Sequence, residues 1–348
     1  MRVPRIAVVG TGWWATTAHL PSLAAYDGAA LVAVCDTRPG RAREVADEFG
    51  VPRAFTDPGA LLREGLADGI VVATPHTTHH ALARGALDAG VHVLVEKPLT
   101  TTAADAWDLV RAAESADLHL CVGYTYQHTR TAEFVRQAVR ERIGDLVCVA
   151  AEFASATFTL FQGGEDPAVP SQPHPTTYAD PARSGGGQGH TQVTHLMGMV
   201  LWATGREVDE VSCYMDNRGL AVDVADVMAY RFAGGGTGTV TSTGTAVGGQ
   251  PPHQRIRYYG TRGCVEQDLQ AATATLYRDD GERVTCAPSA GEAAYPTDAP
   301  ARRFADLLAG RGPNLSPGRP GAATVAFLDA AYRSAASGSA VRTIRADG

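Results

Sequence analysis

Short apolar runs alternate with helical segments throughout the first 120 residues of the chain. The clearest runs cover residues 6–9, 31–35, 70–73 and 91–95, and valine is their commonest residue. Continuous apolar runs separated by helices are typical of parallel strands that are buried on both faces. We therefore predict a doubly wound α/β fold with a parallel sheet over residues 1–123.

The pattern changes after Tyr124. Residues 162–184 hold five prolines and no periodicity, which predicts a long surface loop. Several strand-like runs with glycine-rich turns then lie between residues 208 and 286, a pattern typical of an antiparallel sheet. We predict that residues 124–348 form a second, α+β domain.

The charge balance restricts the partners of the chain. Its 348 residues include 30 Lys and Arg against 37 Asp and Glu, a formal net charge of −7. This balance argues against a nucleic-acid-binding surface and against a basic membrane-binding face. No apolar run approaches the roughly 20 residues that span a bilayer, and the first strand begins so early that we expect no signal peptide. The six cysteines lie singly, so we predict no disulfide framework, no zinc site and a cytoplasmic location.

A glycine motif follows the first apolar run directly. Residues 10–15 read Gly-Thr-Gly-Trp-Trp-Ala, which matches G-x-G-x-x-A, and they open a helical segment. Gly10 allows a tight turn, Gly12 lets the backbone approach a pyrophosphate, and the small Ala15 allows close helix–strand packing. The start of the helix adds amide N–H groups and the positive end of its dipole. This context of strand, turn and helix predicts a dinucleotide-binding Rossmann domain.

Asp36 ends the second apolar run, about 20 residues after the motif. Its carboxylate can accept hydrogen bonds from the adenosine ribose and would repel a 2′-phosphate, so we predict NAD rather than NADP. Thr37 and Arg38 are predicted cofactor contacts as well, and Arg38 leaves NADP open. Of the adjacent Trp13 and Trp14, we expect one to shield the cofactor and the other to pack inside. The alternative is a tight turn with a helix-capping aspartate.

Three histidines follow the third clear run. Ligands of doubly wound sheets bind at the carboxyl ends of the strands, so we predict that Thr74, Pro75 and His79 contact the nicotinamide half of the cofactor. We expect His76 and His80 to be partly solvated. A metal site is not predicted, because no carboxylate or cysteine has a fitting position beside these histidines.

Lys97 follows the run 91–95 and is the only lysine among the 30 basic residues. Arginine stays protonated in proteins, whereas the pKa of a lysine can shift so that its amine exchanges a proton near neutrality. We therefore predict that Lys97 is catalytic and contacts both cofactor and substrate. The preceding Glu96 would orient the ribose or the lysine. The alternative is an ordinary ion-paired lysine.

These features resemble one known family. The glycine motif, Asp36, Thr74-Pro75, Glu96-Lys97-Pro98 and the Gly185-Gly-Gly187 turn are similar to motifs of the Gfo/Idh/MocA oxidoreductases, and the similarity extends from about residue 3 to residue 345. The resemblance implies an open, mostly antiparallel second sheet whose outer face forms homodimers or homotetramers. It also implies a nicotinamide cofactor and a substrate hydroxyl or ketone on a sugar, inositol or related polyol.

The resemblance also implies catalytic partners for Lys97. The family's Asp-x-x-x-His pair after the glycine-rich turn falls on Thr191 and His195. A hydroxyl cannot replace a carboxylate base, so we expect proton transfer to depend on Lys97 and His195, with Thr191 among the substrate contacts. Further substrate contacts are predicted at Tyr126, His128, Gln188, His190 and Gln192.

Together these patterns predict an NAD-dependent dehydrogenase or ketoreductase. It would transfer a hydride between nicotinamide and a ring carbon of a sugar, aminosugar or cyclitol, for example in aminoglycoside biosynthesis. Two alternatives remain open. One is a redox-neutral enzyme that recycles the cofactor during epimerisation, elimination or glycoside cleavage. The other is a non-catalytic nucleotide-binding regulator, which the missing aspartate at position 191 would favour.

Overall fold

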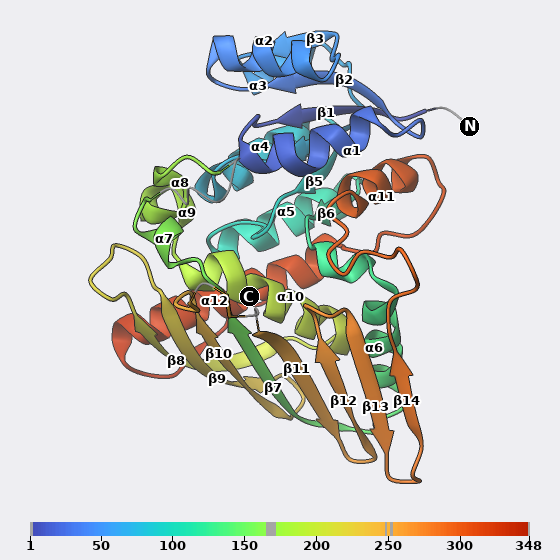
Figure 1. Ribbon diagram of the computed structural model, residues 1–348. Helices are drawn as coiled ribbons and strands as arrows, with labels where there is room; N and C mark the ends of the chain where they lie inside the picture. Colours follow the sequence, from blue (N-terminus) through green and yellow to red (C-terminus); the bar gives the residue numbers. More distant parts are fainter. Residues whose placement is uncertain (1–2, 165–171, 248, 251–252, 347–348) are drawn as a thin grey trace.

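The computed structural model describes residues 3–164, 172–247, 249–250 and 253–346. It contains two sheets, one built from the N-terminal third of the chain and the other from the remainder. Helices fill the space between the two sheets (Figure 1).

The first sheet has six parallel strands in the order β3-β2-β1-β4-β5-β6. Their bounds are β1 Arg5–Val9, β2 Ala30–Cys35, β3 Arg53–Phe55, β4 Gly69–Val72, β5 His92–Val95 and β6 Leu120–Val122. The predicted doubly wound parallel sheet is confirmed. The strand order reverses between β1 and β4, so a ligand crevice is expected at the carboxyl ends of these two strands.

Helices connect these strands. They are the π-helical turn η1 Ala15–His19, α1 Leu20–Ala24, α2 Pro39–Glu48, α3 Pro58–Arg63, the 3₁₀ turn η2 His76–Thr78, α4 His79–Asp88 and α5 Ala103–Ser115. Helix α5 shows how the sequence directs them. Thr102 caps its start by accepting the N–H of Asp105, and its apolar residues, among them Trp107 and Val110, are buried.

The second sheet has nine strands in the order β14-β13-β12-β11-β7-β10-β9-β8-β15. Their bounds are β7 Leu146–Ala154, β8 Val208–Asp216, β9 Ala225–Phe232, β10 Thr237–Thr243, β11 His253–Gly260, β12 Gly263–Asp268, β13 Thr273–Arg278, β14 Arg283–Cys286 and β15 Val341–Arg342. Only β7 and β10 pair in parallel, so the predicted antiparallel character is confirmed. In β9, buried Met228 and Tyr230 alternate with outward-facing residues such as Val227.

The remaining helices follow β6. They are the 3₁₀ turn η3 Thr125–His128, α6 Arg130–Glu141, α7 Phe158–Phe161, α8 Thr176–Ala179, α9 Pro181–Ser184, the π-helical turn η4 Gly189–Val193, α10 Thr194–Thr204, α11 Ala299–Leu308 and α12 Gly318–Ser337. None of the helices in the described ranges is both long and apolar enough to cross a membrane.

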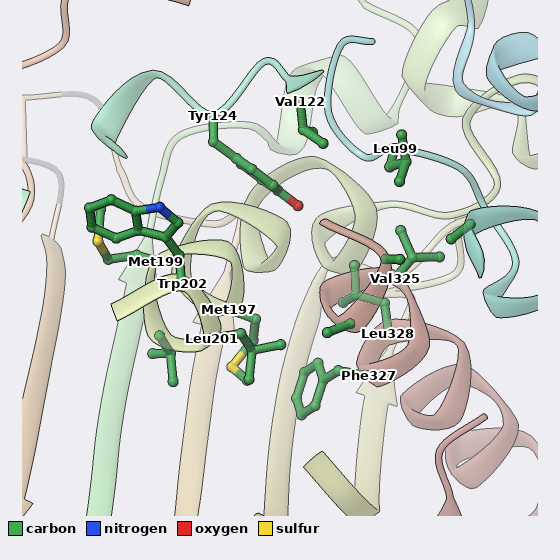
Figure 2. Packing of buried hydrophobic residues seen from close by; sticks show 14 of the residues in the cluster. Leu99, Val122, Tyr124, Met197, Met199, Leu201, Trp202, Val325, Phe327 and Leu328 are labelled. Atoms are coloured by element: carbon green, nitrogen blue, oxygen red, sulfur yellow. The ribbon is translucent and has the colours of Figure 1, made fainter. Parts of the chain in front are cut away.

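Helix α10 is the centre of the layer between the sheets. Its residues 194–203 are all buried, and it contacts both α6 and α12. Figure 2 shows Met197 and Leu201 of α10 near Phe327 of α12, with Tyr124 above them. This packing holds α10 between α6 and α12.

The proline-rich segment differs from the predicted loop. Residues 165–171 lie outside the described part, but residues 176–184 contain the short helices α8 and α9. Pro181 starts α9, and the Asp180 side chain caps it by accepting the N–H of Ala182. Proline at a first helical position initiates a helix rather than breaking one, which explains the difference.

Helix α11 returns to the first sheet although it comes late in the chain. Its Phe304 is buried in one cluster with Ile6 and Val8 of β1. Helix α12 then packs against both α5 and β8. The C-terminal segment therefore ties the two sheets together.

Candidate active site

The glycine motif forms a tight turn between β1 and η1. Gly10 has a φ of 91°, and a side chain there would overlap the carbonyl group of Ala73. A Cβ on Gly12 would meet no atom within 4 Å, so the turn is open above this residue, and Ala15 is fully buried. An open, amide-rich turn at the carboxyl end of β1 fits the pyrophosphate of a dinucleotide.

Asp36 lies beside this turn. Its carboxylate accepts hydrogen bonds from the N–H and hydroxyl of Thr11 (3.1 and 2.8 Å) and from Nε of Arg38 (2.9 Å). Burial alone would raise the pKa of Asp36, but the hydrogen bonds from Arg38 and Thr11 outweigh it and hold this pKa below its usual range. The group is therefore an anion near neutral pH, and Thr37 next to it is exposed.

Glu96 organises the end of β5. One carboxylate oxygen accepts Nε1–H of Trp14 (3.0 Å) and lies 2.8 Å from Nε2 of His19, and the other accepts the N–H of Lys97 (3.1 Å). Burial opposes the charge of Glu96, but His19 and Lys97 lower its pKa below the usual range. The hydrogen bond from the Lys97 N–H fits the predicted role of Glu96 in orienting the lysine.

Lys97 projects from this strand end toward the second domain. Its Nζ donates a hydrogen bond to the carbonyl oxygen of Thr191 at 2.9 Å. Burial lowers the pKa of the amine from 10.5 to about 8, although the charge of Glu96 raises it. Among the described residues Lys97 makes no ion pair, so the alternative of an ordinary ion-paired lysine has no support.

His195 meets this region from the first turn of α10. Its ring lies 5.8 Å from that of Tyr126, 6.3 Å from Tyr295 and 6.5 Å from Phe153, measured between centroids. Burial and the charge of Lys97 lower the pKa of His195 well below its usual range, so the imidazole is neutral. Its Nδ1 has no hydrogen-bond partner among the described residues, which leaves a polar atom for a ligand.

Thr191 contacts Lys97 through its backbone. Its hydroxyl donates to the carbonyl oxygen of Gly187 at 2.8 Å, so this side chain is occupied within the π-helical turn η4. The carbonyl of Thr191, in contrast, points at Nζ of Lys97. At this position the chain therefore presents a neutral acceptor in place of a carboxylate.

Two of the three predicted histidines on the first sheet are buried. His79 lies between two backbone carbonyls, those of Pro98 (2.8 Å) and Thr74 (2.9 Å), and so connects the loops that follow β4 and β5. The expectation that His76 is partly solvated is wrong, because its Nδ1 pairs with the carbonyl of Ser184 and the residue is buried. His80 is partly exposed beside Asp108, as expected.

Two predicted substrate contacts lie away from Lys97. The amide of Gln188 is buried and bonded to the hydroxyls of Ser242 (2.9 Å) and Thr157 (3.0 Å). His128 lines a separate small cavity with Arg303 under α11. Gly-rich and 3₁₀ turns point successive side chains in different directions. Gln188 and His128 therefore do not join the site, although each is close in sequence to a residue that does.

The other predicted second-domain residues lie nearer. Tyr126 packs its ring on His195 and donates its hydroxyl to Gln254 of β11. Gln192 is partly buried within η4. His190 stacks on Tyr332, with 4.7 Å between ring centroids. Across the described residues, no group of three or more His, Cys, Asp or Glu side chains is arranged to hold a metal ion.

Three side chains of this region were not predicted from the sequence. The ring of Tyr295 lies 4.8 Å from Tyr126 and 6.4 Å from Trp14. The ring of Tyr178 lies 5.9 Å from that of His76, and His19 contacts Glu96. Together with Tyr126, these tyrosines form an aromatic wall beside His195 and His76. Tyr178 and Tyr295 come from aperiodic segments, which give no sequence signal, while the position of His19 in the helix after the glycine motif could have indicated it.

A glycine-rich turn at the end of β1, with a partly buried lysine at the end of β5 and a histidine from a second domain, is typical of a nicotinamide-dependent oxidoreductase. The chain belongs to the Gfo/Idh/MocA family. Residues 4–124 match the model of its oxidoreductase domain with an NAD-binding Rossmann fold, and residues 134–266 match the model of its C-terminal domain. The resemblance stated from the motifs is confirmed, and so is NAD as the cofactor of the Rossmann domain.

Named relatives agree with this membership. The chain is 30% identical over 287 residues to myo-inositol 2-dehydrogenase of Thermotoga maritima, covering 80% of each chain. Its fold is similar to that of an inositol dehydrogenase homolog from Azotobacter vinelandii complexed with NAD⁺ (TM-score 0.81, 23% identity, 98% and 97% coverage). It is also similar to GenD2 from gentamicin A biosynthesis in complex with NAD (TM-score 0.79, 24% identity, 99% and 97% coverage).

Proposed function

We propose that this protein is an NAD-dependent dehydrogenase that transfers a hydride between nicotinamide and a ring carbon of a sugar, aminosugar or cyclitol. The observation that carries the proposal is the setting of Lys97. The single lysine of the chain is partly buried at the carboxyl end of β5, with a pKa of about 8, in the region that His195 reaches from the second domain. The relative that acts on myo-inositol supports the substrate class.

The cofactor residues follow the line of strand ends. The turn at Gly10, Gly12 and Ala15 would hold the pyrophosphate, and Asp36 with its neighbours would meet the adenosine ribose. The nicotinamide half would lie toward the loops after β4 and β5. Thr37 and Arg38 would join Asp36 at the ribose, and Trp13 and Trp14 would contact the cofactor beside the glycine turn. We assign the contacts of the nicotinamide half to Thr74, Pro75, His79, Glu96 and Lys97.

Hydride transfer is the chemistry that NAD supplies when bound, and proton transfer falls to the chain. During oxidation, neutral Lys97 would take the proton of the substrate hydroxyl through Nζ, while the carbonyl of Thr191 holds this atom in place. The free Nδ1 of His195 would hydrogen-bond the same substrate oxygen. In the reverse direction the ammonium of Lys97 would donate the proton, and a pKa of about 8 allows both directions.

The aromatic wall would complete the substrate site. Tyr126, Tyr295 and Tyr178 present apolar ring faces and phenol hydroxyls around His195 and His76. Such a surface suits a cyclic polyol, whose C–H face packs on rings and whose hydroxyls need polar partners. It would also exclude water from the reacting carbon. Gln192 and Thr191 would add polar contacts at the edge of this site.

A substrate screen tests the proposal. Purified protein is incubated with cyclitols, hexoses, uronates and aminoglycosides in the presence of NAD or NADP, and the reduced cofactor is followed by absorbance. We expect reduction of NAD with at least one cyclic polyol and its loss in Lys97→Ala. Products formed without net reduced cofactor would instead assign a redox-neutral reaction. Tight NAD binding with no product across the panel would assign a non-catalytic nucleotide-binding role.

We propose in addition that the protein works in the cytoplasm as a homodimer or homotetramer. All six cysteines are free, as a reducing compartment requires. The outer face of the second sheet exposes Tyr214, Val227 and Tyr259, which a second copy of the chain would cover.

A further inference from the structure

Asp223 is a buried carboxylate that the proposed reaction does not use. It lies just before β9, and its side chain faces the glycine-rich turn that precedes η4. One oxygen accepts the N–H of Gly187 and the other accepts the N–H of Gly189, each at 2.7 Å. The hydroxyl of Tyr332 donates to the first oxygen at 2.8 Å. Its own backbone carbonyl also accepts the N–H of Gln188 at 2.9 Å.

The turn is packed tightly against these partners. A side chain at Gly187 would overlap the backbone of Asp223, and one at Gly186 would overlap the phenol of Tyr332. His190 stacks on the same phenol ring. The position of the turn is therefore set by Asp223 and Tyr332, and three successive N–H groups point at a single residue.

A continuous series of hydrogen bonds leads from this carboxylate to Lys97. The carbonyl of Gly187, whose N–H is held by Asp223, accepts both the N–H (3.0 Å) and the hydroxyl (2.8 Å) of Thr191. The carbonyl of Thr191 in turn accepts Nζ–H of Lys97. Because these hydrogen bonds are short, movement of the turn would move the Thr191 carbonyl oxygen that accepts from Lys97.

The neighbouring Asp226 lacks these contacts. It is buried beside Asp223, and its carboxyl oxygens have no hydrogen-bond partner of ordinary geometry in the described part of the chain. Burial and the negative charge of Asp223 raise the pKa of Asp226 well above its usual range, so it is protonated. The two aspartates therefore differ in charge and in the bonding of Asp223 to the turn.

We propose that Asp223 is a positioning residue for Lys97, because it fixes the glycine-rich turn and through it the Thr191 carbonyl that holds the amine. In this chain the carboxylate of Asp223 would thus help to position Lys97 indirectly, in place of the aspartate that is absent at position 191. The proposal rests on the proposed role of Lys97 in proton transfer.

The single lysine makes a direct test available without any substrate. Protein grown with lysine labelled with ¹³C at Cε gives one lysine resonance, and its shift against pH reports the pKa of Lys97. Asp223→Asn keeps the size of the side chain but can accept only one of the two amide N–H groups with its single oxygen. Asp226→Asn is the control, since it changes a buried aspartate that lies three residues later and has no bond to the turn.

In Asp223→Asn we expect the titration midpoint of Lys97 to fall by at least about half a pH unit, because the ammonium loses its acceptor. We also expect slower transverse relaxation of the Lys97 Cε, which reports a freed side chain, whereas loss of a distant charge alone would leave the relaxation unchanged. Asp226→Asn should keep both values, and both variants should bind NAD as the parent does. On a substrate found by the screen, kcat should fall at least about tenfold with little change in KM.

An unchanged midpoint or unchanged relaxation in folded Asp223→Asn overturns the positioning role. Equal changes in Asp226→Asn overturn it as well, since they would indicate a general effect on the buried pair. The resonance of Lys97 can be measured even if no substrate is turned over. Failure of the proposed function and failure of this inference are therefore distinguishable.

Discussion

Burial of Lys97 sets the pH at which its amine can act in either direction. Its pKa is lowered from 10.5 to about 8 by burial. Oxidation needs the neutral amine, so kcat/KM for oxidation should rise with pH and level off above about 8. Reduction needs the ammonium and should decline over the same range. Initial rates in both directions check this, and profiles of the same sign in both directions would contradict the assignment.

Replacing Lys97 with arginine separates positive charge from proton transfer. Arginine keeps the charge but cannot release a proton near neutrality, so turnover in Lys97→Arg should fall by about 10²–10⁴. The turn at Gly10 and Asp36 is untouched, so NAD affinity measured by calorimetry should stay within about twofold. Arg43→Lys, an exchange at an exposed position, serves as the control. Loss of NAD binding together with turnover would indicate a structural role for Lys97.

Asp36 should determine the choice between the two nicotinamide cofactors. Its ionised carboxylate repels a 2′-phosphate, while Arg38, bonded to it at 2.9 Å, would be released to pair with that phosphate in Asp36→Ser. We expect kcat/KM with NAD to fall about tenfold, as for loss of a charged hydrogen bond, and the value with NADP to rise. Glu44→Ser removes a nearby exposed carboxylate and is the control. An unchanged ratio of the two values would rule out this role.

Local patterns explain why some of these residues were predictable. The glycine motif, Asp36 and Lys97 each follow an apolar run directly, and the carboxyl ends of parallel strands meet at one edge of the sheet. His19 reaches Glu96 across 77 residues, and Tyr295 meets His195 from a segment without periodicity. Such contacts depend on tertiary packing, which spacing does not encode. The same holds for Gln188, whose amide turns toward Ser242 instead of Lys97.

The π-helical turn η4 is the element that decides which group faces the lysine. It lets the carbonyl of Thr191 reach Nζ, so the contact is neutral. Thr191→Asp would place a carboxylate beside the amine and should raise the pKa of Lys97 by about one unit or more. The pH profile of oxidation should then move to higher pH. The ¹³Cε titration measures the pKa of Lys97, and initial rates measure the pH profile. Thr191→Val keeps the carbonyl and should leave the pKa unchanged, and an equal change in both variants would exclude the charge as the cause.

Elements with strong periodicity were predicted well, and short ones were not. The apolar strands are buried on both faces and the helix over residues 130–141 on one, and each kind of burial leaves a pattern that the sequence shows. Strand β3 has only three residues with an exposed Arg53, so its sequence shows no apolar run. Helices α8 and α9 have one turn each; Pro175 precedes α8, and Asp180 and Pro181 start α9. Helices this short are stabilised by their tertiary surroundings rather than by their own propensity.

The C-terminal segment connects the two halves of the fold. We propose the division at residues 1–123 and 124–348 for the two domains, since the strands of each sheet fall on either side of it. Helix α11 crosses this division and buries Phe304 against the first sheet. The nucleotide-binding half therefore depends on residues that follow the second sheet. Sequence order alone could not indicate this, because an amphipathic helix of ten residues fits either sheet.

The uncovered face of the second sheet should hold copies of the chain together. Tyr214 of β8 and Val227 of β9 are cross-strand partners that are 80% and 52% exposed, an unusual exposure for adjacent apolar side chains. Val227→Glu would place a charge in the middle of a buried interface, so we expect a dimer or tetramer to become a monomer in light scattering. Val3→Glu, at a site 45% exposed beside the first sheet, should keep the assembly. A monomeric parent, or an unchanged mass in Val227→Glu, would show that this face is not the interface.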